Sequence, residues 1–419
     1  MSTPDQQELT APAGVGSRSV GRAWFTWFTV VWVAVWMSNQ TPVQLLLPLQ
    51  VNKHSEQWVH GVVVSGAVLG VGGLISLVAG PVAGMLSDRT PTRIGRRRPW
   101  AIGGSVVAAA ALVVLSRVTD NVAIGLTWTV YSVAFAVAAT AFTALIADQL
   151  DAQRGAASGV VGGAQGAGLV LGVALVVVLG LSLGVAYLVL AVFLLVAGVA
   201  GALALPDPPV APVRRDVPRG EVRGSRGRDF RTVVLSRAIV SLGNGAPTSL
   251  LLFFLLHGIE MPHHDAESIL LLTIVVFTVS VIVSSAVGGR ISDATGNRRG
   301  LVMTGSTLLA VGALLLLLVP TPTAVLVSGL VNGTGYGLFL TVGLAMATDL
   351  LPAEADNGRD IAFVNVATNI GAVGGPLLGA GLVAAVGDFR LMYLVAAVLT
   401  LGGGLLLLAV RRPERARVV

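Results

Sequence analysis

Long apolar segments alternate with short polar ones along the whole chain. Each apolar segment has about twenty or more residues, which is long enough for a helix to cross a hydrocarbon core of roughly 30 Å. The pattern therefore predicts an all-α membrane protein with twelve transmembrane helices. The predicted spans are 23–48, 58–83, 100–117, 122–148, 156–180, 184–205, 233–258, 267–289, 300–319, 323–350, 360–386 and 389–410.

Composition agrees with this pattern. Of the 419 residues, 54% are hydrophobic and 11% are charged, and the mean hydropathy is +0.83. Soluble domains carry roughly 25% charged residues, so an ordinary soluble enzyme and a disordered scaffold are excluded. The chain has no cysteine, which excludes disulfides, thiol catalysis and Cys-ligated metal sites. We expect no cofactor and no metal.

Basic residues indicate the orientation of the spans. If the N-terminus is cytoplasmic, 24 of the 27 Lys and Arg residues fall in cytoplasmic segments. The remaining three are Lys53, which is the only lysine, Arg117 and Arg390. This asymmetry predicts that both termini are cytoplasmic, in a multi-pass protein of the plasma membrane. The net charge of +6 is then a feature of topology, and we expect no nucleic-acid partner.

A polar stretch rich in Pro, Arg and Gly divides the chain near its middle. Proline at this density prevents a regular helix, so the stretch is predicted to be a cytoplasmic linker. Its arginines are suited to contact anionic lipid headgroups. Besides membrane lipids we expect only a small-molecule solute as partner, and a monomer. The predicted segments are 1–21 (N-terminal tail), 22–205 (first six-helix half), 206–232 (linker), 233–410 (second six-helix half) and 411–419 (C-terminal tail).

The two halves resemble each other in sequence at a nearly fixed spacing. Residues 39–47 and 244–252 share the pattern Asn-x-x-Pro-x-x-Leu-Leu-Leu, 205 residues apart. A Ser-Asp pair after the second span recurs after the eighth at the same spacing, and Asp148 recurs as Asp349, 201 residues on. These matches indicate a duplication. A six-plus-six parallel repeat is typical of major facilitator carriers, in which the substrate lies between the halves near the midplane.

The loop after the second span, residues 84–100, is predicted to act in gating. It is a tight cytoplasmic turn that places the Asp88 carboxylate among five arginines, and these arginines can form bidentate pairs with Asp148. We expect contacts that latch the cytoplasmic face in one state and break in the other; the alternative is that the arginines only orient the spans. The predicted latch residues are Gly84, Asp88, Arg89, Gly95, Arg96, Arg97, Asp148, Asp293 and Asp349.

This loop resembles the long signature loop of plant sucrose carriers, their animal solute-carrier relatives and bacterial sugar:cation symporters. That form reads Ser-Asp-Arg, five residues, then Gly-Arg-Arg-Arg-Pro and an aromatic residue, and residues 87–100 fit it throughout. Residues 41–45 and 144–148 are also similar to that group. The resemblance implies proton-coupled sugar transport, although Ser132 and Thr143 stand where sucrose carriers place an intramembrane Asp and a sugar-contacting Arg.

Polar uncharged residues are the candidates for a substrate site. No charged residue lies at the middle of a predicted span, which favours a neutral solute. Amides and a tryptophan recur at i, i+4 on predicted cavity-lining spans, and such groups suit a hydroxyl-rich ligand. The alternative role is hydrogen bonding between packed helices. The candidates are Trp36, Asn39, Gln40, Gln44, Gln165, Asn244, Thr248, Asn332, Tyr336, Asn365 and Asn369.

Several residues bear on coupling and bending. Asp148 and Asp349 are alternative proton carriers, since no carboxylate lies deeper in a span. All five histidines fall at outer ends or in outer loops, where they are either solvated or sense external pH. Pro42 and Pro247 are expected to loosen their spans.

The sequence thus predicts a secondary active transporter that works by alternating access, with the proton gradient as its energy source. The cargo is expected to be a neutral polar solute such as a sugar or glycoside. One alternative is an efflux antiporter for drugs or secondary metabolites, because residues 371–379 resemble the Gly-Pro motif of drug antiporters. A second alternative is a non-transporting membrane sensor. An enzyme is not expected, because nucleotide-binding and nucleophile-elbow motifs are absent.

Overall fold

The computed structural model describes residues 20–55, 57–90, 92–150, 153–207, 227–350 and 357–410, and gives only the helix path for 357–363 and 365. Every regular element in these ranges is helical. The N-terminal half contains α1 (Arg22–Thr41), a π-helical turn (Pro42–Leu46), α2 (Leu47–Lys53), α3 (Trp58–Asp88), α4 (Arg98–Leu115), α5 (Asn121–Gln149), α6 (Arg154–Val178) and α7 (Leu183–Ala204). The C-terminal half contains α8 (Arg228–Ser249), α9 (Leu251–Phe253), a π-helical turn (Phe254–Gly258), α10 (His263–Thr295), α11 (Arg298–Leu318), α12 (Pro322–Asp349), α13 (Asn357–Val386), α14 (Arg390–Leu405) and a 3₁₀ turn (Leu406–Ala409).

Ten helices of the described ranges are long and apolar enough to cross a membrane, and the bent pair Arg228–Ser249 and Leu251–Gly258 makes an eleventh span. The predicted first span is helical throughout, from α1 through the π-helical turn into α2. It is not among these spans, because four tryptophans and the polar run 38–40 make α1 less apolar. The all-helical membrane fold is therefore present, while the count of twelve spans stays a prediction.

Local sequence explains several helix ends. The carboxylate of Asp120 accepts a hydrogen bond from the Ala123 amide at 2.8 Å and starts α5. Asn297 caps α11 in the same way, through the Gly300 amide. Gly296 ends α10 with φ of 65°, in the left-handed region that glycine enters without a steric penalty. These caps satisfy backbone groups that a helix end leaves free.

The spans that contain Pro42 and Pro247 depart from regular α-helix, as expected. Pro42 opens the π-helical turn between α1 and α2. Pro247 precedes the break at Leu250, where the helix axis bends by 45°. Proline has no N–H to donate to the preceding turn, so it weakens the helix at these points. Equivalent spans of the two halves are therefore interrupted at nearly equivalent places.

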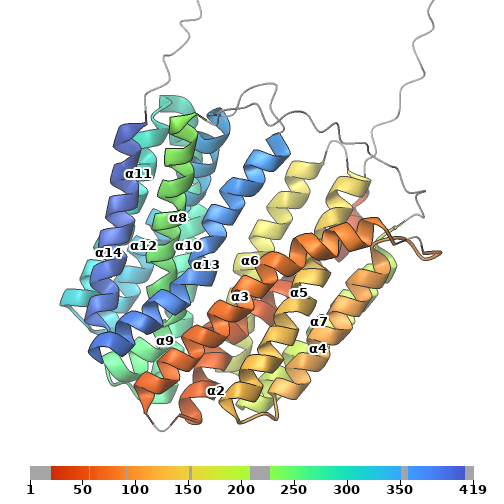
Figure 1. The fold of residues 1–419 in the computed structure, drawn as a ribbon, viewed down its shortest axis with the longest axis horizontal. Coiled ribbons are helices and arrows are strands. Elements are labelled where there is room, and N and C mark those ends of the chain that lie inside the picture. The colour runs from red at the N-terminus through yellow and green to blue at the C-terminus, as the bar shows by residue number, and fades with distance from the viewer. Residues whose placement is uncertain are drawn as a thin grey trace, which may run out of the picture.

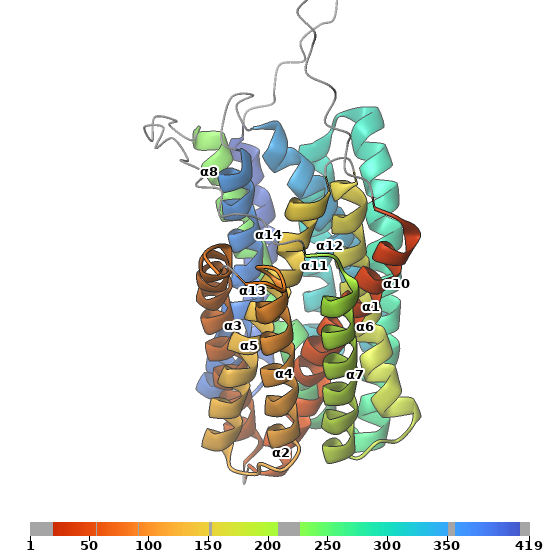
Figure 2. The same cartoon turned by 90° about the vertical axis from the view of Figure 1, so that its right-hand side faces the viewer.

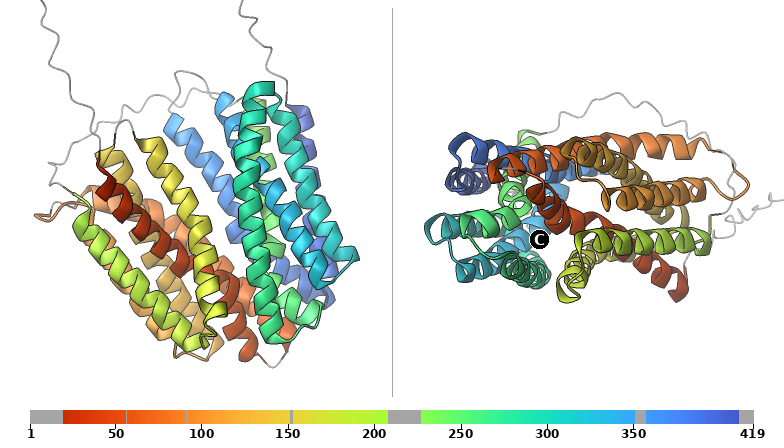
Figure 3. Two further views of the ribbon diagram at one scale, coloured as in Figure 1. Left: turned by 180° about the vertical axis from the view of Figure 1, so that it is seen from behind. Right: turned by 90° about the horizontal axis from the view of Figure 1, so that it is seen from below.

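The two halves form separate helical bundles that lie side by side in Figure 1, and in Figure 2 the N-terminal half lies in front of the C-terminal half. We call the end at which α7 ends and α8 begins the linker end, and the opposite end, next to α2 and α9, the far end. In Figure 1 the bundles spread apart toward the linker end and come together at the far end. The view from behind in Figure 3 shows the same arrangement on the side of α6 and α10.

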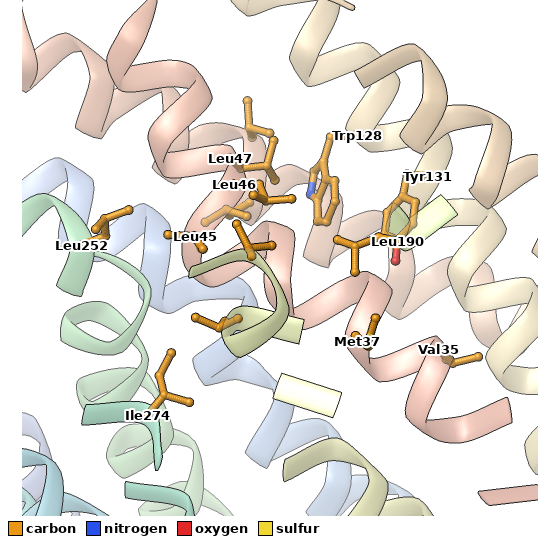
Figure 4. Packing of buried hydrophobic residues seen from close by; sticks show 14 of the residues in the cluster. Val35, Met37, Leu45, Leu46, Leu47, Trp128, Tyr131, Leu190, Leu252 and Ile274 are labelled. Carbon is orange, nitrogen blue, oxygen red and sulfur yellow. The ribbon is translucent and has the colours of Figure 1, made fainter. Parts of the chain in front are cut away.

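Buried apolar side chains join the halves at the far end. One continuous cluster contains Leu45 to Leu47 of the N-terminal half together with Leu252 to Leu256 of the C-terminal half (Figure 4). A second cluster, which includes Phe230, Phe339 and Val364, belongs to the C-terminal half alone. The hydrophobic core is thus shared at the far end and divided between the two bundles elsewhere.

Helices α3 and α13 make a close crossing between the halves. A Cβ atom placed on Gly66 would lie 2.3 Å from Ala380 Cβ and 2.6 Å from the Pro376 carbonyl oxygen. One turn further, a Cβ on Gly70 would meet the side chain of Leu377 at 2.3 Å. Glycine lets two helix backbones approach this closely. On the other side of the molecule, Gly166 of α6 approaches Thr278 of α10.

Candidate functional site

The N-terminal candidates for the substrate site lie on α1, the adjoining π-helical turn and α6. Trp36 is half-buried, with its ring 6.0 Å from that of Phe135 on α5. Its indole nitrogen is buried and has no hydrogen-bond partner. Asn39, Gln40 and Gln44 are also half-buried, and Asn39 lies beside the Tyr131 hydroxyl. The π-helical turn begins between Gln40 and Gln44, so these two residues do not continue one regular helical face.

Gln165 is exposed on α6. Three residues further, Gly168 packs against α1, where its Cβ would lie 2.9 Å from Trp36 Cβ. The adjacent Gly166 approaches α10 of the other half. Gln165 therefore lies on α6 between the side that contacts α1 and the side that contacts the C-terminal half, which is a suitable position for a residue lining the space between the halves.

The C-terminal candidates lie on α8, α12 and α13. Asn244 and Thr248 are half-buried on α8, and the Thr248 hydroxyl donates to the Asn244 carbonyl at 2.7 Å. Tyr336 is half-buried with its ring 5.9 Å from that of Phe277 on α10, and Asn369 is exposed on α13. The side chain of Asn365 lies outside the described residues.

Asn332 has a packing role in this structure. Its Nδ2 donates to the Ser328 hydroxyl at 2.9 Å, and Ser328 in turn donates to the Gly312 carbonyl of α11. A Cβ on Gly312 would lie 2.2 Å from Asn332 Oδ1, so the amide is held closely against α11. These contacts correspond to the helix-packing alternative considered for the amides.

The signature loop forms an ion-pair cluster within the N-terminal half. Arg97 is 6% exposed, and its Nε donates to Asp148 at 3.0 Å while its Nη2 donates to Asp88 at 2.5 Å. Its Nη1 donates to the Ser87 hydroxyl. Arg96 Nη2 lies 2.5 Å from the other oxygen of Asp148. The predicted pairing of loop arginines with Asp148 is present, and it ties the ends of α3, α4 and α5 together.

Asp207 and Arg98 cap each other's helices. Asp207 is the second residue after the sixth predicted span. Its carboxylate accepts hydrogen bonds from the backbone amides of Arg97 and Arg98 at 2.7 and 2.9 Å and so caps α4. The Arg98 guanidinium donates to the carbonyls of Ala202, Leu203 and Leu205 at the end of α7. Each charge matches the sign that the helix dipole favours.

The backbone conformation and close packing at position 95 require glycine. It has φ of 103°, and a Cβ there would lie 2.2 Å from the Asp207 carboxylate. Of the other predicted latch residues in this loop, Gly84 has ordinary contacts and Arg89 is exposed.

The C-terminal half contains a reduced copy of this cluster. Arg298 Nη1 lies 2.5 Å from Asp349 and donates to the Ala345 carbonyl at 2.6 Å, and Arg299 donates to the Val410 carbonyl at 3.1 Å. Asp293 is exposed and does not pair with Arg298. Only two residues separate α10 from α11, so Arg298 has no loop on which to fold back toward Asp293. Both clusters join helices of one half only.

A polar and aromatic contact joins the halves at the far end. The His257 Nε2–H donates to Asn52 Oδ1 at 2.8 Å. The Trp58 ring stacks on His257 on one side, at 5.3 Å between centroids, and on Phe389 on the other, at 5.4 Å. We call Asn52, Trp58, His257 and Phe389 the far-end contact. Within the described ranges, the bond between Asn52 and His257 is the one side-chain hydrogen bond between the halves.

The sequence matches the Major Facilitator Superfamily over residues 92–262 and 233–419, which is more than half of the chain. The chain belongs to the Major Facilitator Superfamily. It is accordingly a transporter and not an enzyme, and a multi-pass protein of the plasma membrane. Among the described residues, no group of three or more His, Asp or Glu side chains is placed to hold a metal ion.

Solved structures of transporters share this fold. The nucleoside transporter NupG superposes with a TM-score of 0.72 at 14% identity, over 93% of this chain and 99% of that one. A bacterial homologue of the human lysosomal transporter Spinster, in an inward-facing and occupied conformation, gives a TM-score of 0.69 at 13% identity, over 93% and 97%. A short segment of 43 residues is 44% identical to an uncharacterized symporter, sll1374 of Synechocystis sp.. That match spans 10% of this chain and only 8% of the relative's length.

Arg237 is a charged residue of this superfamily member that the sequence pattern did not single out. It lies nine residues into α8 and is 3% exposed. Its Nη2 donates to the Thr368 hydroxyl of α13 at 3.0 Å, its Nη1 donates to the Phe339 carbonyl of α12, and it lies 5.2 Å from the Phe339 ring centre. No carboxylate among the described residues pairs with it. Arg237 therefore links three helices of the C-terminal half and is closed off from the space between the halves.

Proposed function

We propose that this protein is a twelve-span secondary active transporter that moves a neutral, hydroxyl-rich solute such as a sugar or glycoside by alternating access, driven by the proton gradient. The arrangement of the halves is the observation that carries the proposal. They share a core and a hydrogen bond at the far end, whereas both ion-pair clusters at the linker end lie within single halves. Two rigid bundles joined at one end are the geometry that a rocking motion requires.

The orientation follows from the arginine asymmetry, which favours a cytoplasmic linker end. The structure then corresponds to an inward-open state with its outer end closed. In this state the predicted latch residues Asp88, Arg97 and Asp148 already contact one another inside the N-terminal half. We infer that they give α3, α4 and α5 one rigid cytoplasmic surface, against which the other half closes.

The polar residues support a neutral solute. Trp36 offers an apolar ring, and Gln40 and Gln44 offer donors and acceptors on the N-terminal half. Asn244, Tyr336 and Asn369 are the counterparts on the C-terminal half. The Arg237 charge is directed at Thr368 and Phe339 within its own half, so it does not call for an anionic cargo. NupG, a solved structure of the same fold, is a nucleoside transporter.

Uptake of labelled disaccharides and glucosides tests the proposal. The protein is expressed in cells that lack their own sugar carriers, and uptake is measured with and without an uncoupler. We expect accumulation that collapses when the uncoupler is added. If the uncoupler leaves the accumulation unchanged, the proposal of sugar transport stands and the proposal of proton coupling is wrong.

The efflux alternative is tested in the same experiment. If the protein is in the membrane and no sugar enters, everted vesicles loaded with amphipathic compounds become the next assay. The glycines of residues 371–379 pack against α8, where a Cβ on Gly375 would lie 2.5 Å from the backbone of Gly245. This close packing accounts for the segment without a role in efflux. Transport in neither direction would favour the sensor alternative.

A further inference from the structure

We propose that His257 is a proton-binding site that controls the far-end contact: the neutral imidazole holds the contact closed, and the protonated imidazole opens it. The proposal rests on the alternating-access function above. It adds a site to that function, because neither the signature loop nor the substrate candidates include His257.

A proton shifts a conformational equilibrium only if it binds one state more tightly than the other. The ion pairs of Arg97 with Asp148 and of Arg298 with Asp349 lie inside single halves, so each keeps its partner when the halves move as units. His257 differs, because its hydrogen-bond partner Asn52 belongs to the other half. The imidazole must therefore change its surroundings whenever the far end opens.

Burial of the imidazole ring disfavours its charged form in the closed state. The neutral ring donates its Nε2–H to Asn52 and leaves Nδ1 as the position for a second proton. The ring is half-buried and stacks between Trp58 and Phe253, at centroid distances of 5.3 and 6.2 Å. A full charge there has lost much of its water, and the π-face of Trp58 replaces only part of that hydration. When the halves separate, water replaces Trp58, so the charged ring is more stable in the open state.

The other charged groups near the contact include one further histidine, an ion pair and several groups on the adjoining elements. His263 on α10 is the neighbour whose positive charge acts on His257. Asp388 and Arg390, which flank Phe389, pair with each other at 3.3 Å. His54 Nδ1 lies 2.7 Å from the Gln50 carbonyl within its own helix. The remaining charged or titratable groups on the elements around the contact are Lys53, His60, Glu260, His264, Asp265 and Glu267.

The chemical step is a single proton transfer. A proton from the outer solution adds to Nδ1 of His257 when the far end is open, and it returns to that solution when the imidazole is again enclosed. No other bond forms or breaks. Acidity on the outer side therefore increases the population that faces outward and is ready to load solute.

Spin labels on the native cysteine-free background test this directly. Thr119 and Pro320 lie in exposed turns at the far end, one on each half. The double variant Thr119→Cys/Pro320→Cys carries the two spin labels. Pulsed electron–electron double resonance on the full-length protein in lipid nanodiscs then reports the fractions of long and short distances between the two spin labels. We expect the long-distance fraction to rise severalfold between about pH 8 and about pH 5.5, on either side of the ordinary imidazole titration.

Matched variants assign the effect. His257→Gln keeps a side chain that can hydrogen-bond Asn52 and cannot titrate, so its distance distribution should not depend on pH. His264→Gln replaces a histidine whose side chain is 92% exposed and should keep the wild-type pH dependence. Asn52→Ala should favour the open state at every pH while it keeps the pH dependence.

The outcomes separate this inference from the transport function. The role of His257 would be overturned if the distance distribution of the wild type did not depend on pH, or if His257→Gln kept the pH dependence. Alternating access would stand in either case. A single distance population under all conditions, with and without the solute found by uptake, would count against alternating access itself.

Discussion

Asn52 and His257 hydrogen-bond to each other across the halves at 2.8 Å, and they are exactly one repeat apart in sequence, at a separation of 205 residues. Two equivalent positions of a duplicated fold can touch only close to the pseudo-two-fold axis that relates the halves. The contact therefore marks where this axis leaves the molecule at its far end. A solute that enters along the axis meets this pair first.

Cross-linking this pair should stop transport. In the double variant Asn52→Cys/His257→Cys, a short bifunctional thiol reagent with a reducible spacer should hold the far end closed, and a reducing agent should restore uptake. The wild-type chain has no cysteine, so each single variant is a clean control. Full uptake by cross-linked protein would show that the far end need not open at Asn52 and His257.

The glycine crossing of α3 and α13 should be sensitive to one added methyl group. Gly66→Ala places a Cβ 2.3 Å from Ala380 Cβ, so the helices must separate, at a cost of about 1–3 kcal/mol to the closed far end. We expect labelling of a far-end cysteine, introduced at Trp58, to become faster. Gly103→Ala on α4 meets no atom within 4 Å and is the matched control. Equal labelling rates in both variants would contradict this prediction.

Loss of Asp148 should destabilise the protein more than loss of Asp349. Asp148→Asn leaves Arg97, whose side chain is 8% exposed, without one of its two carboxylate partners and should cost about 2–3 kcal/mol. Asp349 is 47% exposed and pairs with one arginine, so Asp349→Asn should cost about 0–1 kcal/mol. Thermal unfolding in detergent compares the two variants. A larger loss of unfolding temperature in Asp349→Asn would be inconsistent with the burial of these pairs.

The substrate candidates should affect the Michaelis constant more than the turnover rate. Gln40→Ala and Asn244→Ala each remove an amide that we propose to bind hydroxyl groups, so KM should rise by about threefold to tenfold, on the scale of one hydrogen bond. Thr307→Ala, on an exposed face of α11, should leave both parameters unchanged. An unchanged KM in both amide variants would remove these residues from the site.

Much of this architecture can be predicted from the sequence, because the sequence patterns that indicate it are periodic or local. Apolar length predicts the helices, and the 201-residue spacing of Asp148 and Asp349 anticipates equivalent ion pairs. The same spacing relates Arg97 to Arg298 and Arg98 to Arg299, and their contacts are equivalent in the structure.

Other features depend on directions in space that a linear pattern does not contain. Asn332 and Tyr336 share a helical face by spacing, yet the Asn332 amide is held against Gly312 of α11. The burial of Arg237 became visible only when α8 was seen to begin at Arg228, several residues before the predicted span. One feature of the sequence pointed to Asp207, which is an acidic residue two positions after an apolar span. Its partners, however, lie more than a hundred residues earlier in the chain.

The reciprocal caps of Arg98 and Asp207 bear on the order in which the protein is built. Every residue of that ring lies within the first 207 positions, so the first bundle can complete its own helix ends before the second emerges from the ribosome. The equivalent bond of the second bundle, from Arg299 to the Val410 carbonyl, closes only after residue 410 has been synthesised. The first bundle can therefore be complete before the second is synthesised, and it then provides the surface on which the second bundle assembles.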